Sequence, residues 1–370
     1  MKCKIEDIVE VTMGQSPKSQ YYNSEGNGVP FLQGNRTFGF KRPTFDTYTT
    51  LVTKSAKAGD VIMSVRAPVG DLNITPVDMC LGRGVCSLRM KNGNQEFLYY
   101  MMKYYMPQLL NKESGTVFGS VNRNDISGLE VDIPEDTDEQ RKIARYLTMI
   151  DDKIELNTAI NNNLEQQAQA IFKAWFVDFI PFNGVRPDNW TISSLGEVTN
   201  MGAGGDKPKI ISAIQTEECP YPIYSNGLSE NGLYGYTNTP KICDESVTVS
   251  ARGTIGFVCI RHTPYVPIVR LVTLIPNTEI ISAKYLYLYL KQLNITGTGT
   301  TQQQLTVPDF RKTEILIPDK ETMSAFTDII APLFSKIWAN EKENANLSAT
   351  RDTLLPKLMS EELDVSDIEF

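Results

Sequence analysis

The strongest constraint on the fold of this chain is that its sequence repeats itself after about half of its length. The segment 126–147, ISGLEVDIPEDTDEQRKIARYL, is similar to the segment 310–330, FRKTEILIPDKETMSAFTDII. Each begins as an alternating, strand-like run, ends that run in Ile-Pro and continues through an acidic turn into a helical pattern. A chain of 370 residues with this repeat is predicted to contain two copies of one unit, each large enough for its own core.

Both helical patterns carry the same long apolar stripe. Apolar residues recur at alternating steps of four and three, and the two stripes keep a constant offset of 183 residues, from Ile143 to Phe326 onward. Spacing of this kind, sustained over several heptads, is typical of a coiled coil. The predicted seam consists of Ile143, Leu147, Ile150, Ile154, Asn157, Asn161 and Leu164 in the first helix and of Ile330, Leu333, Ile337, Asn340, Asn344, Leu347 and Leu354 in the second.

Two asparagines interrupt each stripe at the same place. The first helix leaves the first globular part and enters the second, whereas the second helix leaves the second, so a pair of these helices must run antiparallel. That pairing places Asn157 against Asn344 and Asn161 against Asn340. Buried asparagines fix register and partner at a cost in stability. The alternative is that they face solvent on two unrelated surface helices.

Local signals predict how each helix begins and how regular it is. Thr137 followed by Gln140 predicts a capping box at the start of the first helix. Pro332 and Pro356 fall inside the second helix, where a missing N–H and a bulky ring disturb helical geometry, so we expect it to be the less regular of the two.

The segments outside the helices predict an α+β fold with a pseudo-twofold internal repeat. We expect mixed α/β domains at 1–134 and 181–318 and spacer helices at 135–180 and 319–370, the last ending in an acidic tail. The two domains resemble each other at 59–75 and 245–261, and again at 96–105 and 284–293. The segments 115–126 and 299–310 begin alike and then differ in a polar loop, VFGSVNRN against TQQQLTVP.

Two copies of one domain that carry different polar loops are what a protein that recognises two different ligands would have. Glutamine can both donate and accept, as adenine recognition requires, and arginine suits guanine or phosphate. Ordinary solvated loop residues are the alternative for any one of these side chains. The candidate DNA-contacting residues are Arg66, Ser120, Asn122, Arg123, Ser250, Arg252, Thr254, Thr301, Gln302, Gln303 and Gln304.

The net charge of −8 argues against a nucleic-acid partner only until it is divided by segment. Residues 1–134 carry 15 Lys and Arg against 13 Asp and Glu, and residues 181–318 carry 11 against 11. The negative excess lies in the helical segments, with 5 against 9 in 135–180 and 5 against 11 in 319–370. The globular parts are therefore neutral to weakly basic, which permits a basic face on each.

The chain offers little material for catalysis. Its one histidine, His262, leaves no basis for a histidine triad or a histidine-rich metal site, and the six cysteines show no CxxC pair. The glycine-rich stretch 202–209, GAGGDKPK, lacks the spacing of a phosphate loop. We predict no catalytic residue, no metal ligand and no cofactor in this chain. The absence of a long apolar run and the acidic N-terminus favour a cytoplasmic protein with no membrane partner.

Several stretches resemble the specificity subunits of type I restriction-modification systems, over nearly the whole chain. They are GQSPKSQYYNSEGNGVPFLQGN (14–35), AGDVIMSVRAPVGDLNI (58–74), CLGRGVCSL (80–88), YPIYSNGLSENGLYGYTN (221–238), PDNW (187–190) and the two Ile-Pro-plus-helix segments. The resemblance implies two target-recognition domains that each read one half of a split sequence in double-stranded DNA, held apart by antiparallel spacer helices.

The same resemblance implies the partners. Two modification subunits would bind S-adenosylmethionine and methylate adenine, and restriction subunits would use ATP and Mg²⁺ to translocate and cut. An adenine-methylase motif of the Asn-Pro-Pro-Tyr type is absent here, which fits a non-catalytic chain in a restriction and methylation complex. Two alternatives remain open: a specificity subunit of a methylation-only system, and a scaffold whose coiled coil joins two protein- or glycan-binding modules.

Overall fold

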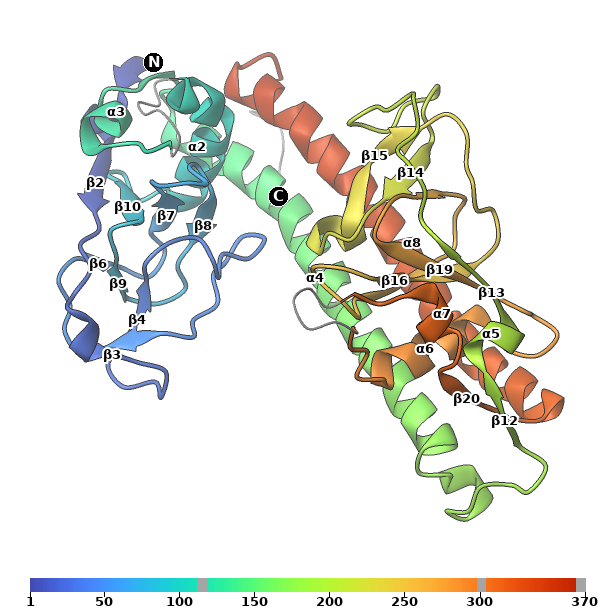
Figure 1. Ribbon diagram of the computed structural model, residues 1–370. Coiled ribbons are helices and arrows are strands. Elements are labelled where there is room, and N and C mark those ends of the chain that lie inside the picture. The colour runs from blue at the N-terminus through green and yellow to red at the C-terminus, as the bar shows by residue number, and fades with distance from the viewer. Residues whose placement is uncertain (112–118, 298–303, 364–370) are drawn as a thin grey trace. The chain divides into compact units, whose positions relative to one another are not determined.

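The computed structural model describes residues 1–111, 119–297 and 304–363 (Figure 1). Tertiary contacts divide the chain into two compact units. The first unit comprises Met1–Ala159 and Asn340–Phe370, and the second comprises Ile160–Ala339. Each unit therefore contains one mixed α/β domain together with part of both long helices, α4 (Thr137–Phe176) and α8 (Lys320–Met359). The fold is α+β with an internal repeat, as the sequence predicted.

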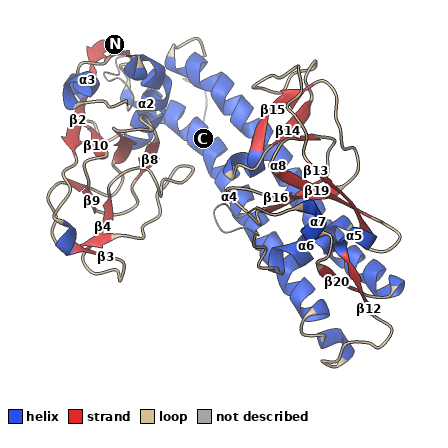
Figure 2. Ribbon diagram, viewed as in Figure 1, coloured by secondary structure: helices blue, strands red, loops and turns tan. Residues whose placement is uncertain are grey.

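The domain of the first unit is built on three sheets with strand orders β1-β11, β2-β10-β7-β8 and β3-β5-β4-β9-β6. Helix α2 packs on β7, β8 and β10 of the four-stranded sheet (Figure 2). The elements are β1 (Lys2–Lys4), α1 (Ile5–Ile8), β2 (Val9–Met13), β3 (Tyr22–Asn23), β4 (Val29–Leu32), β5 (Tyr48–Thr49), β6 (Ser55–Ala56), β7 (Val61–Ser64), β8 (Leu72–Ile74), β9 (Met79–Leu81), β10 (Val85–Met90), α2 (Gln95–Leu110), α3 (Arg123–Ser127) and β11 (Glu130–Asp132).

The domain of the second unit has the same plan. Its sheets have the strand orders β12-β20, β13-β19-β16-β17 and β15-β14-β18, and helix α6 packs on β16, β17 and β19. The elements are β12 (Thr191–Ser194), α5 (Leu195–Val198), β13 (Thr199–Ala203), β14 (Tyr221–Tyr224), β15 (Leu233–Thr237), β16 (Ser246–Ser250), β17 (Val258–Arg261), β18 (Val266–Pro267), β19 (Leu271–Pro276), α6 (Ala283–Gln292), α7 (Val307–Phe310) and β20 (Glu314–Ile317).

The repeat extends to individual backbone hydrogen bonds. The turn after β7 is closed by the Gly70 N–H, which donates to Ser64 O at 3.0 Å, and the turn after β16 by the Gly256 N–H, which donates to Ser250 O at 3.0 Å. Strands β4 and β9 pair in parallel, as do β14 and β18. The loose sequence similarity between the two domains therefore reflects one backbone frame built twice.

Within each unit the two long helices run antiparallel. In the first unit Asp151 pairs with Arg351, and Asn157 donates to Asn344, so positions rise along α4 as they fall along α8. In the second unit Asn161 donates to the Ile337 carbonyl and the Phe172 ring lies 6.0 Å from the Phe326 ring, so positions again rise along α4 as they fall along α8. Both helices contain 40 residues, and α8 continues through both of its prolines, so the expected loss of regularity does not shorten it.

The start of α4 corrects one sequence prediction. The Asp138 N–H donates to a carboxylate oxygen of Asp136 at 2.9 Å, so Asp136 rather than Thr137 supplies the side-chain cap. The Gln140 side-chain amide donates to Pro134 O at 2.9 Å and does not close a capping box. The second helix begins in the same way, since Asp319 accepts from the Thr322 N–H at 2.9 Å. A carboxylate is favoured here because it also meets the positive end of the helix dipole.

Every residue of the predicted seam is buried or half-buried along these helices. Asn157 has 1% of its surface exposed, and its side-chain amide donates to Asn344 Oδ1 at 2.9 Å and to Glu343 at 2.8 Å. The Asn161 amide donates to the Ile337 carbonyl at 3.2 Å. All six cysteines are free thiols. None of the helices in the described part of the chain combines the length and apolarity needed to cross a membrane.

Candidate nucleic-acid interface

In the first unit, three loops distant in sequence meet beyond the end of the four-stranded sheet. The Val65 N–H donates to Gly84 O at 2.9 Å, and the Val121 N–H donates to Val65 O at 3.1 Å. Arg66 and Ser120 form an isolated antiparallel bridge. The structure therefore brings these two predicted residues together, and both are exposed.

The same junction exists in the second unit. The Ala251 N–H donates to Arg270 O at 2.8 Å, and the Leu305 N–H donates to Ala251 O at 2.9 Å. Arg252 and Gln304 are the chain neighbours of these bonded residues, so they lie at one junction although 52 positions separate them in the sequence. We name these two places, centred on Val65 and on Ala251, the loop junctions of the two units.

A side chain that sequence reasoning missed braces the second loop junction. The Asn226 amide donates to Arg252 O at 2.8 Å, and the Thr254 hydroxyl donates to Asn226 O at 2.6 Å. Thr254, a predicted contact residue, thus uses its hydroxyl proton to hold the loop, and only its oxygen lone pairs remain for a ligand. Asn226 could not be found from sequence because the carbonyl that it binds lies 26 residues away.

The prediction that Ser250 contacts DNA is corrected by the structure. Only 1% of the Ser250 surface is exposed, so its hydroxyl does not reach the molecular surface and cannot contact DNA in this conformation. The equivalent Ser64 is also 1% exposed, and its hydroxyl donates to Pro68 O and accepts from the Asp71 N–H, each at 2.9 Å. Serine at this position belongs to the turn rather than to the surface, because β7 and β16 are buried along their whole length.

Asn122 and Arg123 begin helix α3. The Asn122 side-chain oxygen accepts from the N–H groups of Asn124 at 2.8 Å and Asp125 at 3.2 Å, which makes Asn122 the N-cap. Its oxygen is thus occupied, and its NH₂ group remains as a donor. Arg123, the first helical residue, is exposed one position further on.

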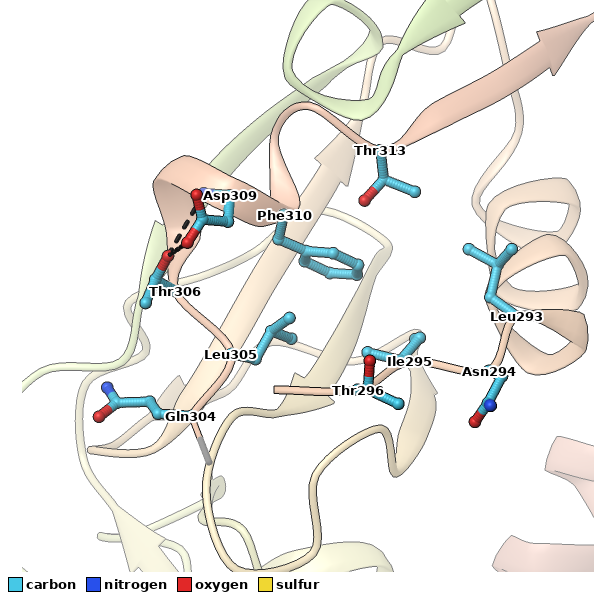
Figure 3. Close-up of a pocket in the computed structure, with 10 residues that line it drawn as sticks. All are labelled: Leu293, Asn294, Ile295, Thr296, Gln304, Leu305, Thr306, Asp309, Phe310 and Thr313. Atoms are coloured by element: carbon cyan, nitrogen blue, oxygen red, sulfur yellow. Dashed lines mark hydrogen bonds between the residues drawn. The ribbon is translucent and has the colours of Figure 1, made fainter. Parts of the chain in front are cut away.

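Gln304 stands at the rim of a pocket of about 250 Å³ in the second unit (Figure 3). The pocket is lined mainly by apolar and hydroxyl side chains, with Leu305 and Phe310 among them, and Thr306 caps the adjoining helix α7 through the Asp309 N–H at 3.3 Å. Figure 3 shows the Gln304 side chain extending away from Leu305 and Phe310. The other predicted residues of this loop, Thr301, Gln302 and Gln303, lie outside the described residues.

The glycine-rich stretch 202–209 lies against the second loop junction. The Gly204 N–H donates to Leu271 O at 2.8 Å, and a side chain at Gly204 would place its Cβ only 2.1 Å from Ile268 O, so glycine is needed for this close approach. Within the same stretch, the Lys207 ammonium lies 4.1 Å from the centre of the Tyr234 ring. The stretch thus brings a cation and an aromatic face to this end of the domain.

Comparison with known proteins decides which family these units represent. The family model for the type I restriction modification DNA specificity domain matches residues 1–166 and again 187–349. The chain belongs to this family. Each matched segment of this specificity-domain protein contains one loop junction, so the family model and the backbone hydrogen bonds identify the same repeat.

Curated relatives carry the corresponding names. The type I restriction enzyme MjaIX specificity subunit of Methanocaldococcus jannaschii is 25% identical, covering 99% of this chain and 94% of that relative. The HindI specificity subunit of Haemophilus influenzae is 27% identical over 84% of this chain and 88% of the relative. The putative MjaX specificity subunit of M. jannaschii is 36% identical, but that match spans only 45% of this chain and 39% of the relative's own length.

A solved structure has the same fold. The crystal structure of the type I restriction-modification system S subunit from M. genitalium matches with a TM-score of 0.61 and 17% identity, covering 99% of this chain and 96% of that one. Among the described residues of this specificity-domain protein, no group of three or more His, Cys, Asp and Glu side chains is placed to hold a metal ion.

Proposed function

We propose that this protein is the sequence-specific DNA-binding subunit of a type I restriction-modification complex and that each unit reads one half of a bipartite site. The proposal extends the family membership to DNA recognition by these residues. The target-recognition domains would be residues 1–134 and 181–318, with 135–180 and 319–370 as spacer helices that set the gap between the half-sites.

One observation carries this proposal. The two loop junctions share their backbone hydrogen bonds and an arginine, Arg66 in one unit and Arg252 in the other, but the side chain beside it differs, Ser120 against Gln304. A rigid frame that presents different donors and acceptors is what reading two different base sequences requires, because sequence is read through side-chain contacts to base edges.

The chemistry would belong to partner subunits. We propose that two modification subunits supply S-adenosylmethionine and methylate adenine, and that restriction subunits supply the ATP- and Mg²⁺-dependent translocation and cleavage, in the cytoplasm. This chain would bind DNA weakly alone, since its net charge of −8 opposes phosphate contacts, and tightly once its partners complete the complex.

The test is a domain exchange followed by genome-wide mapping of methylated adenines. Cells carrying the full chain and its modification subunit should show a split methylation motif that disappears when this gene is deleted. Replacing residues 181–318 by the equivalent segment of another family member should change one half of the motif and leave the other half intact. A motif altered in both halves would contradict modular reading. Methylation that is independent of this gene would favour a scaffold role instead.

A further inference from the structure

Arg270 stands at the second loop junction in an unfavourable backbone conformation. Its φ angle is +75°, in the left-handed region that residues with a Cβ rarely adopt. It follows β18 and directly precedes β19, and its carbonyl accepts the hydrogen bond from Ala251 that closes the junction. The residue is exposed, so the conformation does not arise from packing of its side chain in a core.

The equivalent position in the first unit is a glycine. The Gly84 carbonyl accepts from the Val65 N–H as the Arg270 carbonyl accepts from the Ala251 N–H, and each acceptor residue lies 19 positions after its donor residue. A Cβ at Gly84 would lie 2.3 Å from Gln33 O, so that turn excludes a side chain. The first unit carries its arginine one residue earlier, at Arg83, which is also exposed.

Neither of these guanidinium groups has a partner among the residues that the structure describes. Across residues 1–111, 119–297 and 304–363, the side chains of Arg83 and Arg270 make no hydrogen bond and no ion pair, although both arginines lie beside a candidate contact loop. The hydrogen bond from Ala251 to the Arg270 carbonyl thus holds Arg270 next to the Arg252 loop. Cationic groups gathered in this way attract an anionic ligand.

A left-handed conformation at a residue other than glycine is unfavourable, because Cβ comes too close to the following carbonyl oxygen. Glycine at position 270 would remove that cost. Gly84 of the first unit is not in the left-handed region, and glycine is required there by the close approach to Gln33 O. An arginine therefore occupies a turn for which glycine is the better residue, and it contributes nothing to the interior of the domain. Such strain, at an exposed and unpartnered cation, indicates a role outside the fold.

We propose that Arg270 contacts DNA in the half-site read by the second unit, and that Arg83 does so in the half-site read by the first. The proposal rests on the proposed function and adds to it a second recognition turn in each unit, beside the one that carries Arg66 or Arg252. The guanidinium presents two parallel N–H donors, which match either the O6 and N7 acceptors of guanine or the oxygens of a phosphate.

The test uses Arg270→Gly and Arg270→Ala in the full chain, purified with its modification subunit. The probe is a fluorescent duplex of about four turns that carries the mapped methylation site. Both variants should bind it roughly 5- to 150-fold more weakly than the wild-type complex, the range for losing one bidentate base contact. Arg270→Gly should keep or raise the melting temperature, because it relieves the left-handed strain. Arg186→Ala, at another exposed arginine of the same unit, removes the same charge and should change binding less than about twofold.

Two readouts identify the atoms contacted, and each supports the proposal. Loss of preference at a single base pair of the second half-site would indicate a guanine contact. Uniform weakening, with a salt dependence lower by about one ion, would indicate a phosphate contact.

Unchanged binding by Arg270→Ala would overturn the inference, even if Arg270→Gly bound weakly, since only the backbone would then matter. A wild-type complex without sequence-specific binding would overturn the proposed function itself, which is a different result.

Discussion

A buried ion pair between the two long helices provides the sharpest stability test in the first unit. Arg351 lies between the seam residues Leu347 and Leu354 of α8, at the position where the repeat has Ala168 in α4. Its guanidinium lies 2.8 Å from Asp151 Oδ1, and Asp151 is fully buried. The second carboxylate oxygen accepts from the Tyr100 hydroxyl at 2.7 Å. Burial raises the pKa of Tyr100 far above its ordinary value, so the hydroxyl keeps its proton and remains a donor. Helices α2, α4 and α8 are thus joined at one carboxylate.

Replacing Arg351 with Met should destabilise the first unit strongly. Methionine retains most of the aliphatic length but leaves the Asp151 carboxylate buried with Tyr100 as its remaining partner. Removing one member of a buried ion pair costs about 3–5 kcal/mol. For a unit of this size, about 2–4 °C of melting temperature corresponds to each kcal/mol, so we expect a fall of about 6–20 °C. The double variant Asp151→Asn with Arg351→Met should recover most of that loss, because the buried group is then neutral and can still accept from Tyr100.

Differential scanning calorimetry of the full chain is the suitable assay, since it can separate the unfolding of two units. The control is Arg141→Met. Arg141 lies 2.5 Å from Asp138, but both side chains are exposed, at 63% and 75%, so this surface pair should contribute at most about 1 kcal/mol. If Arg351→Met melted within 2 °C of the wild type, or if adding Asp151→Asn gave no recovery, the buried pair would not stabilise the unit and the reasoning would be wrong.

Three further results are expected. The His262 ring stacks on Trp338 at 4.2 Å, and partial burial lowers the His262 pKa, with Glu245 opposing and Lys284 and Arg261 adding to the effect. The unfolded chain then binds a proton that the folded chain resists, so the melting temperature should fall more in the wild type than in His262→Phe as pH drops below about 6.5. Asn157→Leu removes the amide that donates to Asn344 and leaves the Asn344 oxygen without that donor, so adding Asn344→Leu should raise the melting temperature above that of the single variant. A further fall in melting temperature would mean that other hydrogen bonds stabilise this pair of positions. Inserting four residues after Asn161 lengthens α4 by roughly 6 Å, so methylation mapping of any active variant should show the same two half-sequences with a gap longer by one or two base pairs. An unchanged gap would exclude the helices as the element that sets the spacing.

The coiled-coil pattern could be predicted because it depends on periods that are local in sequence. A helix places residues three and four positions apart on one face, so the stripe from Ile143 to Leu164 and its copy in the second helix identify the buried faces without any knowledge of the domains. The antiparallel direction could be predicted from the chain path, since the first helix enters the second globular part and the second helix leaves it. Helix ends were less predictable, because Asp136 and Thr137 both suit a cap and the Gln140 amide can bind either the cap or the Pro134 carbonyl six residues earlier, which is its partner in the structure.

The sequence also showed which polar residues the loops contain, but not which of those side chains reach the surface. Arg66 and Arg252 stand out as matching residues in matching turns, and the structure leaves Arg66 exposed at a loop junction. Ser250 matched Ser64 equally well, yet both are turn residues inside the sheet. Sequence similarity shows that the same residue occurs at equivalent positions, but it does not show whether the side chain points into the domain or out of it.

Local periodicity and residue identity at fixed spacing were enough to predict the internal repeat of the chain, the seam of the long helices and the family resemblance. Which loops meet depends instead on the folded arrangement of distant segments. Asn226 reaches Arg252, Ala251 reaches Arg270 and Leu305 reaches Ala251 through hydrogen bonds between segments tens of residues apart, and no local pattern encodes such contacts. The left-handed turn at Arg270 belongs to the same class, since a φ angle is set by the strands that a turn must connect.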